Sequence, residues 1–494
     1  MPRGGFDRGT RGAVRVRPRT GRRIAALVAT GWLAGCQVGP AFRAPHPPVP
    51  PRFDAAAPAN APPAWPRPGW WRNFGSAELS LLVERARQHN FSLRVAVAQL
   101  EIANAQVLGA GAPLLPSLSA AGSGSFSQTG PGAASSGAGG FAGGKNIDTR
   151  RFSATLNASY EIDFWGKNRD ALEAAEANAA AAGFNAATVA LTAEAAVATT
   201  YFQALAYADQ LRTARQNLAA ARGLLTQLQA ELAAGVVDAP TVAQQAALVA
   251  AEAATIPNLM SLYRQETIAL GTLTGQAPEF LRVAGGSLDR LAVPVIRPGL
   301  PSQLLSRRPD IAQATANLIA ANANVRGAIA AFFPSISLTG SAGWQSAALN
   351  TLLSPGSALL SAATSLAQPI FDGGALLSTL RVDRATYSEY VAQYEAAVVQ
   401  ALSDVETALT ALHYATRQQV LQMRAVAQAQ AALVAAEAQL KAGVVDIGTV
   451  LNAEQTLLSD QNTLISVRLT RLDAAVNLYK ALGGGWEQPD NQEH

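Results

Sequence analysis

The sequence predicts a mainly α-helical chain that also carries four long β-strands, built as a tandem duplication. Two alanine-rich segments, 167–234 and 374–442, are each long enough for a helix of almost 70 residues. Four shorter segments alternate apolar and polar residues, as half-buried strands do. Several landmarks recur in the same order about 210 residues apart, which indicates two copies of one plan.

Residues 1–35 have the composition of a bacterial leader. They hold eight arginines and one aspartate, so the formal net charge of +4 for the 494 residues becomes −3 without them. The apolar part, 24–35, is about 12 residues long and too short to span a bilayer of ~30 Å as a helix. We therefore expect a cleaved signal peptide, and the acidic remainder argues against a nucleic-acid partner.

The leader ends in Leu33-Ala34-Gly35-Cys36, which resembles the bacterial lipobox. Cleavage is then expected between Gly35 and Cys36, and Cys36, the sole cysteine, is the expected lipidation site. The alternative is an ordinary signal peptide with a chance cysteine. Gln37 after the cysteine favours sorting to the outer membrane. Beyond this covalent lipid we expect no cofactor.

Residues 36–75 are predicted to form a lipidated, extended strap. Six prolines lie between positions 40 and 51, and proline fixes φ and removes backbone donors. Further along, no stretch offers 18 uncharged apolar residues, so we expect no membrane-spanning helix there.

The duplication places a first repeat at 76–282 and a second at 283–486, followed by a polar tail, 487–494. LAAGVVDAPTV at 232–242 matches LKAGVVDIGTV at 440–450, and LLPSLSAAGSGSF at 114–126 matches FFPSISLTGSAGW at 332–344. Each repeat is expected to run helix, strand, loop, strand, very long helix, tight turn, helix.

Strands are predicted at about 117–127 and 151–164 in the first repeat, and at 335–345 and 361–371 in the second. From Arg151 to Phe164 every even position is apolar and every odd position is polar. At roughly 3.3 Å per residue such strands reach 35–45 Å, which fits a tilted membrane strand.

The helices predicted at 167–234 and 374–442 would each be ~100 Å long at 1.5 Å per residue. The shorter ones at 76–112 and 241–275 together match the length of one long helix. Apolar heptads run along several of these segments, for example from Leu451 to Tyr479.

Four strands cannot close a barrel, for which about eight are the minimum. An open sheet edge in lipid leaves backbone groups unsatisfied at several kcal/mol each. Several chains must therefore share one barrel, and a conducting pore favours three or more copies, because side chains fill an eight-stranded lumen.

Six segments carry a resemblance that covers nearly the whole mature chain. The chain resembles the outer-membrane factors of the TolC superfamily, in particular the NodT/OprM-like lipoproteins of RND efflux pumps. The matching segments are CQVGPAFRAP (36–45), WWRNFGSAELSLLVERARQHN (70–90), YEIDFWGKNR (160–169), SRRPDI (306–311), FFPSISLTG (332–340) and LYKALGGGW (478–486).

This resemblance implies a TolC-like fold: a homotrimer in which four strands per chain form a 12-stranded outer-membrane barrel, continued by a long periplasmic α-barrel. It implies a passive exit duct for drugs or other small molecules, loaded by a periplasmic adaptor and an inner-membrane RND pump. Two alternatives remain, an exit duct for type I protein secretion and a non-conducting, lipid-tethered coiled coil.

The two AGVVD turns would then lie at the periplasmic tips, where Gly235 and Gly443 are expected to end one helix and Asp238 and Asp446 to cap the next. Adaptor docking is implied at Gly235, Val236, Val237, Gly443, Val444 and Val445. The periplasmic aperture is implied at Asp238, Asp446, Gly448, Thr449 and Asn452. Family members often carry aspartate at the position of Asn452 and a bulky residue at Gly448, so this chain would close its tip by other contacts.

Catalysis and metal binding are not expected. The four histidines, His46, His89, His413 and His494, are scattered without metal-ligand spacing. The Arg307-Arg308-Pro309-Asp310 segment has the composition of an active site, but a proline followed by aspartate at the start of an amphipathic segment favours a helix N-terminus.

Overall fold

The computed structural model describes residues 38–54, 64–129 and 147–487. The predicted signal peptide, Cys36 and nearly all of the polar tail lie outside these residues. The chain divides into two compact units, described separately below. The first consists of Met1–Pro40, Gly111–Ala171 and Asn324–Arg381, and the second of Ala41–Ala110, Leu172–Ala323 and Val382–His494.

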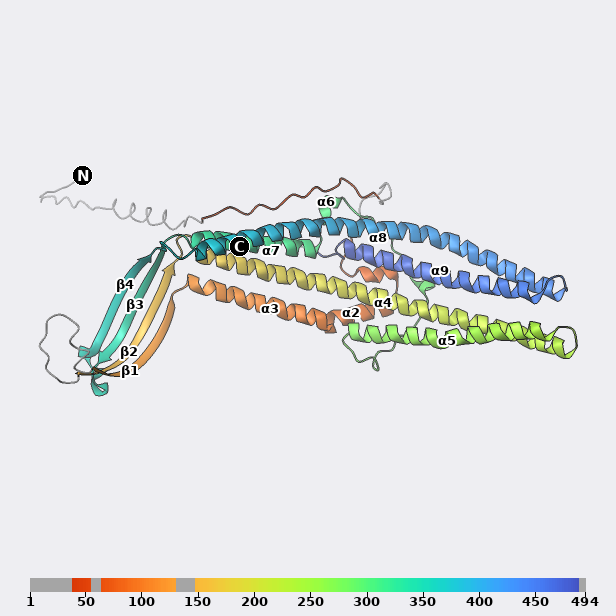
Figure 1. Ribbon diagram of the computed structural model, residues 1–494, viewed down its shortest axis with the longest axis horizontal. Coiled ribbons are helices and arrows are strands. Elements are labelled where there is room, and N and C mark those ends of the chain that lie inside the picture. Colours follow the sequence, from red (N-terminus) through yellow and green to blue (C-terminus); the bar gives the residue numbers. More distant parts are fainter. Residues whose placement is uncertain (1–37, 55–63, 130–146, 488–494) are drawn as a thin grey trace, which may run out of the picture. The chain divides into compact units, whose positions relative to one another are not determined.

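The first unit contains one antiparallel sheet in the order β1-β2-β3-β4 (Figure 1). Its strands are β1 (Ser117–Thr129), β2 (Ile147–Ile162), β3 (Ser335–Ser346) and β4 (Ala358–Ala367). The bounds predicted for β4, 361–371, are wrong at both ends. A proline at position 369 cannot donate to a strand ladder, and β4 ends two residues before it.

The register divides the sheet into an apolar and a polar face. Leu118 pairs with Ala158, Ala158 with Gly340, and Gly340 with Ala362, so the small and apolar positions of all four strands line up. The neighbouring row is polar, and within it the Ser341 and Ser361 hydroxyls are 2.7 Å apart. Side chains of successive residues point to opposite faces, so the alternation in the sequence becomes a two-faced sheet.

Two aspartates cap the long helices where these leave the sheet. Asp163 accepts hydrogen bonds from the backbone N–H groups of Asn168 and Arg169 (3.0 and 2.9 Å). Asp372 accepts them from Gly374 and Leu376 (2.9 and 2.6 Å). The segments DFWGK (163–167) and IFDGG (370–374), which contain these aspartates, are therefore corresponding strand-to-helix junctions of the two repeats.

A buried ion pair lies behind the first junction. The Arg326 Nε donates to Asp170 Oδ1 at 2.9 Å, and the two side chains are 8% and 0% exposed. Nearby, the Trp165 indole stacks on Phe333 with ring centroids 4.6 Å apart and donates to the Pro334 carbonyl at 2.8 Å.

The second unit consists mainly of helices. The first residues of α4 and α8 and the last residues of α7 belong to the first unit. Two hairpins dominate: hairpin A is formed by α4 and α5, and hairpin B by α8 and α9 (Figure 1). The helices are α2 (Ala77–His89), α3 (Phe91–Gly111), α4 (Lys167–Ala233), α5 (Ala239–Leu273), α6 (Pro301–Leu304), α7 (Pro309–Ala330), α8 (Ala375–Lys441) and α9 (Ile447–Ala481), with short 3-10 turns at Trp70–Phe74, Ala112–Leu114, Leu288–Arg290, Leu349–Thr351 and Pro355–Ser357.

The single helix predicted at 76–112 is wrong, because the chain breaks at Asn90. That residue has extended backbone angles; its carboxamide oxygen accepts from the Leu93 N–H at 3.1 Å and its nitrogen donates to the Leu273 carbonyl at 2.9 Å. Gly275 (φ 68°) packs so closely on His89 that any Cβ would strike the His89 carbonyl oxygen. Gly483, 208 residues later, makes the same approach to the Arg307 carbonyl.

The core of the second unit is rich in aromatic residues around the 3-10 turn Trp70–Phe74. Trp70, Trp71 and Phe74 are almost completely buried, and Trp70 stacks on Tyr479 with centroids 5.1 Å apart. Phe53 belongs to the proline-rich strap and is buried in a second apolar cluster, which ties the strap to the helical unit.

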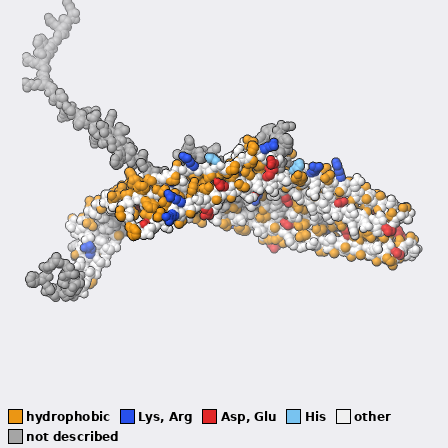
Figure 2. Space-filling model, turned by 45° about the horizontal axis from the view of Figure 1, so that its top comes forward, with side chains coloured by type: hydrophobic (Ala, Val, Ile, Leu, Met, Phe, Trp, Pro, Cys, Tyr) orange, Lys and Arg blue, Asp and Glu red, His pale blue; other side chains and the backbone are white. Residues whose placement is uncertain are grey.

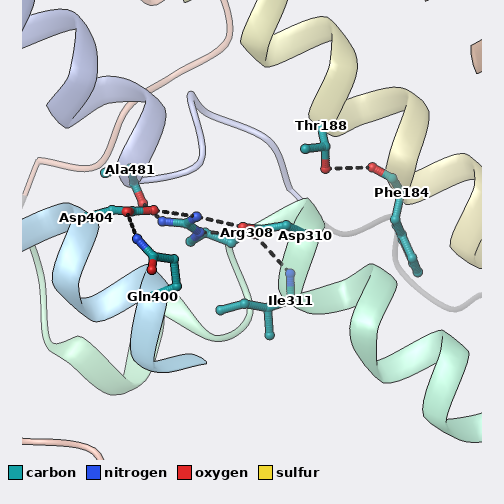
Figure 3. A network of polar contacts seen from close by, with 8 residues as sticks. All are labelled: Phe184, Thr188, Arg308, Asp310, Ile311, Gln400, Asp404 and Ala481. Carbon is teal, nitrogen blue, oxygen red and sulfur yellow. Dashed lines mark hydrogen bonds and ion pairs between the residues drawn. The ribbon is translucent and has the colours of Figure 1, made fainter. Parts of the chain in front are cut away.

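The SRRPDI segment forms a structural clamp (Figure 3). The Arg308 guanidinium donates to Asp310 Oδ1 and Oδ2 (3.0 and 2.6 Å), to Asp404 Oδ2 (3.0 Å) and to the Ala481 carbonyl (3.1 Å). Those carboxylates favour the charged guanidinium and hold the pKa of Arg308 above its ordinary value against the opposing effect of burial. Asp310 also accepts from the Ile311 N–H, which supports its prediction at a helix N-terminus.

One helix departs from the expectation that nothing after the leader could cross a membrane. Among the described residues, α4 contains an 18-residue window with a mean hydropathy of 1.2 and at most two charges, of which 22% is buried. Length and composition by themselves do not place this helix in a membrane.

Candidate functional site

The ends of both hairpins have the same backbone design. The Val236 N–H donates to the Glu231 carbonyl (2.8 Å) and the Gly235 N–H to Leu232 (3.0 Å), which is a Schellman motif with Gly235 at φ 75°. Hairpin B repeats it, with Val444 donating to Gln439 and Gly443, at φ 70°, to Leu440 (2.9 Å each). The prediction that these glycines end helices is confirmed.

The next helix of each hairpin starts with an aspartate N-cap. Asp238 accepts from the Thr241 backbone N–H at 3.1 Å, and Asp446 from that of Thr449 at 3.0 Å. Hydrogen bonds from the Thr241 hydroxyl and N–H hold the pKa of Asp238 below its ordinary value. Both capping predictions are confirmed, and Asp238 is ionised at neutral pH.

A groove of about 690 Å³ runs between the two turns. Of the residues predicted for docking, Val236, Val237, Gly443 and Val445 line it, whereas Gly235 and Val444 do not. Val236 and Val444 are 72% and 71% exposed. The other lining residues were not predicted from the sequence; they come from the last two turns of each long helix and the first turn of the next: Gln227, Leu228, Glu231, Thr241, Leu440, Lys441 and Ile447.

The groove combines an apolar floor with a negative rim. Leu228 and Ile447 are buried in a small cluster with Ala436 and Val450 that holds the hairpins together. Its rim carries the acids Glu231, Asp238 and Asp446 and a single cation, Lys441. Acidic side chains are visible at this end of the hairpins in Figure 2.

The predicted aperture residues do not form one cluster. Gly448 and Thr449 lie against Asp446: a Cβ on Gly448 would be 3.4 Å from Asp446 Oδ1, and the Thr449 hydroxyl donates to the same oxygen at 3.0 Å. Asn452 is exposed one turn further along α9, and Asp238 belongs to the other hairpin. Their role in an aperture remains a prediction.

The sheet unit supplies a second candidate surface, its polar face. Hydroxyl pairs tie neighbouring strands together: Ser123 with Ser153 (2.8 Å), Ser337 with Ser365 (2.6 Å), and Ser341 with Ser361. Within the described residues β1 and β4 each pair with one strand, so both edges of the sheet present unsatisfied backbone groups. Such a face suits contact with water, and such edges suit pairing with further strands.

Metal binding finds no support in the described part of the chain, where no group of three or more His, Cys, Asp or Glu side chains could hold an ion.

Comparison with known proteins now identifies the chain. The model of the family "Outer membrane efflux protein" matches residues 82–276 and 300–484, which is most of the sequence. The chain belongs to this family.

Relatives and solved structures agree with this assignment. The pyoverdine export outer membrane protein OpmQ of Pseudomonas aeruginosa is 38% identical over 86% of this chain and 88% of its own. The cation efflux system protein CusC of Escherichia coli is 32% identical over 92% and 97%. The solved outer-membrane channel OprN superposes with a TM-score of 0.85 at 27% identity, over 91% of this chain and 100% of that one.

The chain is accordingly the outer-membrane channel component of an efflux pump, with the TolC-like fold that its resemblance implied. The non-conducting coiled coil is excluded, and the family is one of efflux proteins rather than enzymes.

Proposed function

We propose that three copies of the chain form one passive exit duct for small molecules. The main support for this proposal is the open four-stranded sheet. Three such sheets, joined β4 to β1, would close a 12-stranded barrel in which the backbone groups of every edge strand are hydrogen-bonded. In that barrel the serine-rich face lines the lumen and the apolar face contacts lipid. The helices α4 and α8, each 67 residues and so ~100 Å long, continue the duct through the periplasm.

The groove between the hairpin ends is the proposed docking site of a periplasmic adaptor, which connects the duct to an inner-membrane RND pump. Exposed valines beside an acidic rim suit a partner that presents apolar and basic side chains. Type I protein secretion is the weaker candidate, because pyoverdine and cation efflux in the relatives' names favour small cargo. We propose no catalytic role and no nucleic-acid partner.

Lipid on Cys36 would tether the strap to the outer membrane. Three acyl chains bind far more firmly than one, so the lipid would add a second membrane anchor to that of the barrel.

A matched pair of substitutions on β4 tests the barrel. Leu360 belongs to the apolar face and Ser361 to the polar face. An arginine facing lipid costs about 2–4 kcal/mol near the bilayer midplane, whereas a lumen-facing one is hydrated. Leu360→Arg is expected to reduce outer-membrane insertion, and Ser361→Arg to insert normally and lower cation conductance in planar bilayers. Equal behaviour of the two variants, or a folded protein that is monomeric in the membrane, would contradict the proposed three-chain duct.

Docking is tested by placing a photo-cross-linking residue at Val236 or Val445, which line the groove, with the exposed Val399 on α8 as the control. Cross-links to the adaptor of the cognate pump are expected from the two hairpin ends and not from position 399. Equal yields at all three positions would remove the groove as the docking site.

A further inference from the structure

Two glutamates with buried, unpartnered carboxyl oxygens lie on different hairpins, and a third glutamate on another helix adds its charge to theirs. Glu252 lies on α5, Glu437 on α8 and Glu454 on α9. The negative charges of Glu437 and Glu252 both act on Glu454. Hairpin A thus supplies one carboxyl group and hairpin B two, close to the cluster that joins the hairpin ends.

The buried oxygens of this cluster are not compensated. Glu252 is 8% exposed and its Oε2 atom has no hydrogen-bond partner, and the Oε2 atom of Glu454 is likewise buried without one. Within the described residues, none of the three glutamates takes part in an ion pair. The nearest cations along the helices that carry Glu252 and Glu437, Arg264 on α5 and Lys441 on α8, are exposed, and so is Arg222 on α4.

The fourth helix does not neutralise the cluster either. The Ala221 carbonyl on α4 accepts a hydrogen bond from the Gln245 side chain at 2.9 Å, and Gln245 lies one heptad before Glu252 on α5. No charge from α4 acts on Glu454. A metal ion is not indicated, because the described acids nowhere form a group that could hold one. A proton is the remaining counter-charge.

We propose that Glu252, Glu437 and Glu454 form a proton-operated latch between hairpins A and B: the hairpins stay packed while the cluster is protonated, and they separate at this end when it ionises. This inference rests on the proposed function, since separation of the hairpin ends would widen the entrance of the duct. A carboxylate oxygen that is buried without a partner is costly when the group is ionised, whereas a carboxylic acid is tolerated there.

The direction of the pH effect follows from Glu454. Burial, and then the charges of Glu437 and Glu252, raise the pKa of Glu454 from 4.5 to about 7 in the packed state. Once the hairpins separate, the carboxyl group is hydrated and its pKa returns toward 4.5. The packed state is therefore fully favoured below pH 4.5, loses its advantage as the pH rises to about 7, and changes little above that value.

The experiment measures the separation of the hairpin ends directly, apart from conduction. Spin labels at positions 236 and 444 of the purified full-length protein report the distance between the turns, and planar bilayers report conductance, both from pH 4.5 to 8.5. The ratio of separated to packed molecules is expected to rise about 10- to 100-fold between pH 4.5 and 7. Glu454→Gln, which mimics the protonated acid, should stay packed over the whole range.

Glu395→Gln, an exposed substitution on α8, is the control and should titrate like the unmodified protein. If Glu454→Gln keeps the full pH response, or if the unmodified protein shows no change in distance, the latch is refuted. A pH-dependent distance in a protein that forms no pore supports the latch and contradicts the channel, so failure of the two proposals can be told apart.

Discussion

Removing the cation of the Arg326–Asp170 pair should destabilise the protein strongly. The pair has an Nε–Oδ1 distance of 2.9 Å and lies in the unit that carries the sheet, with Arg326 8% and Asp170 0% exposed. In Arg326→Met the side chain keeps similar bulk while the buried carboxylate loses the Arg326 guanidinium. Breaking a buried pair in this way costs about 3–5 kcal/mol.

The expected melting shift follows from chain size. An unfolding entropy of about 2.1 cal/mol/K per residue, taken over the 494 residues, gives roughly 1 kcal/mol/K. The midpoint of Arg326→Met should therefore lie about 3–5 °C below that of the unmodified protein. The measurement is circular dichroism of the detergent-solubilised protein at a fixed heating rate.

A surface pair provides the control. Lys167 and Glu161 also approach to 2.9 Å, but their side chains are 47% and 39% exposed. Such a pair is worth about 0–1 kcal/mol, so Lys167→Met should shift the midpoint by no more than about 1 °C. Adding Asp170→Asn to Arg326→Met should recover much of the loss, because the buried charge is gone. A shift in Arg326→Met no larger than in the control, or no recovery in the double variant, would refute the reasoning.

Three further predictions concern the strap, the aperture and the anchor. Phe53→Ala empties a site that is 5% exposed, so it should cost about 3–5 kcal/mol and expose residues 38–54 to limited proteolysis; a strap that stays protected would contradict this. Asp446→Asn keeps the acceptor for Thr449 but removes the charge, so cation preference in bilayers should fall; unchanged conductance and preference would remove Asp446 from the aperture. Cys36→Ser should abolish palmitate labelling while the barrel still inserts, and a soluble folded monomer would show that the strands do not hold the chain in the membrane.

Much of the fold could be predicted because its signals are local. Alternation in Arg151–Phe164 requires a two-faced strand, and the structure has β2 over Ile147–Ile162. The glycine and aspartate of each AGVVD turn are needed for a left-handed C′ residue and an N-cap, so both turns follow from the sequence. The break at Asn90 was missed because half of its cause is remote, namely the hydrogen bond to Leu273 in α5.

The candidate site was only half predictable for the same reason. Val236 and Val237 could be found in the AGVVD repeat, but the groove also needs Leu228 and Leu440, which only the pairing of hairpins A and B brings together. Glu252 and Glu454 are ordinary polar residues of amphipathic helices in the sequence, and their lack of partners is visible only after the helices pack.

The sequence by itself determined the duplication, the two-faced strands, the long helices and the turns that join them, since each depends on neighbours a few residues apart. Tertiary structure decided which side chains become buried or meet across long stretches of sequence, as Arg308 meets Asp404 and Ala481, 96 and 173 positions away. Burial and long-range contact are properties of packing, and they set the energies on which the groove, the latch and the buried ion pair depend.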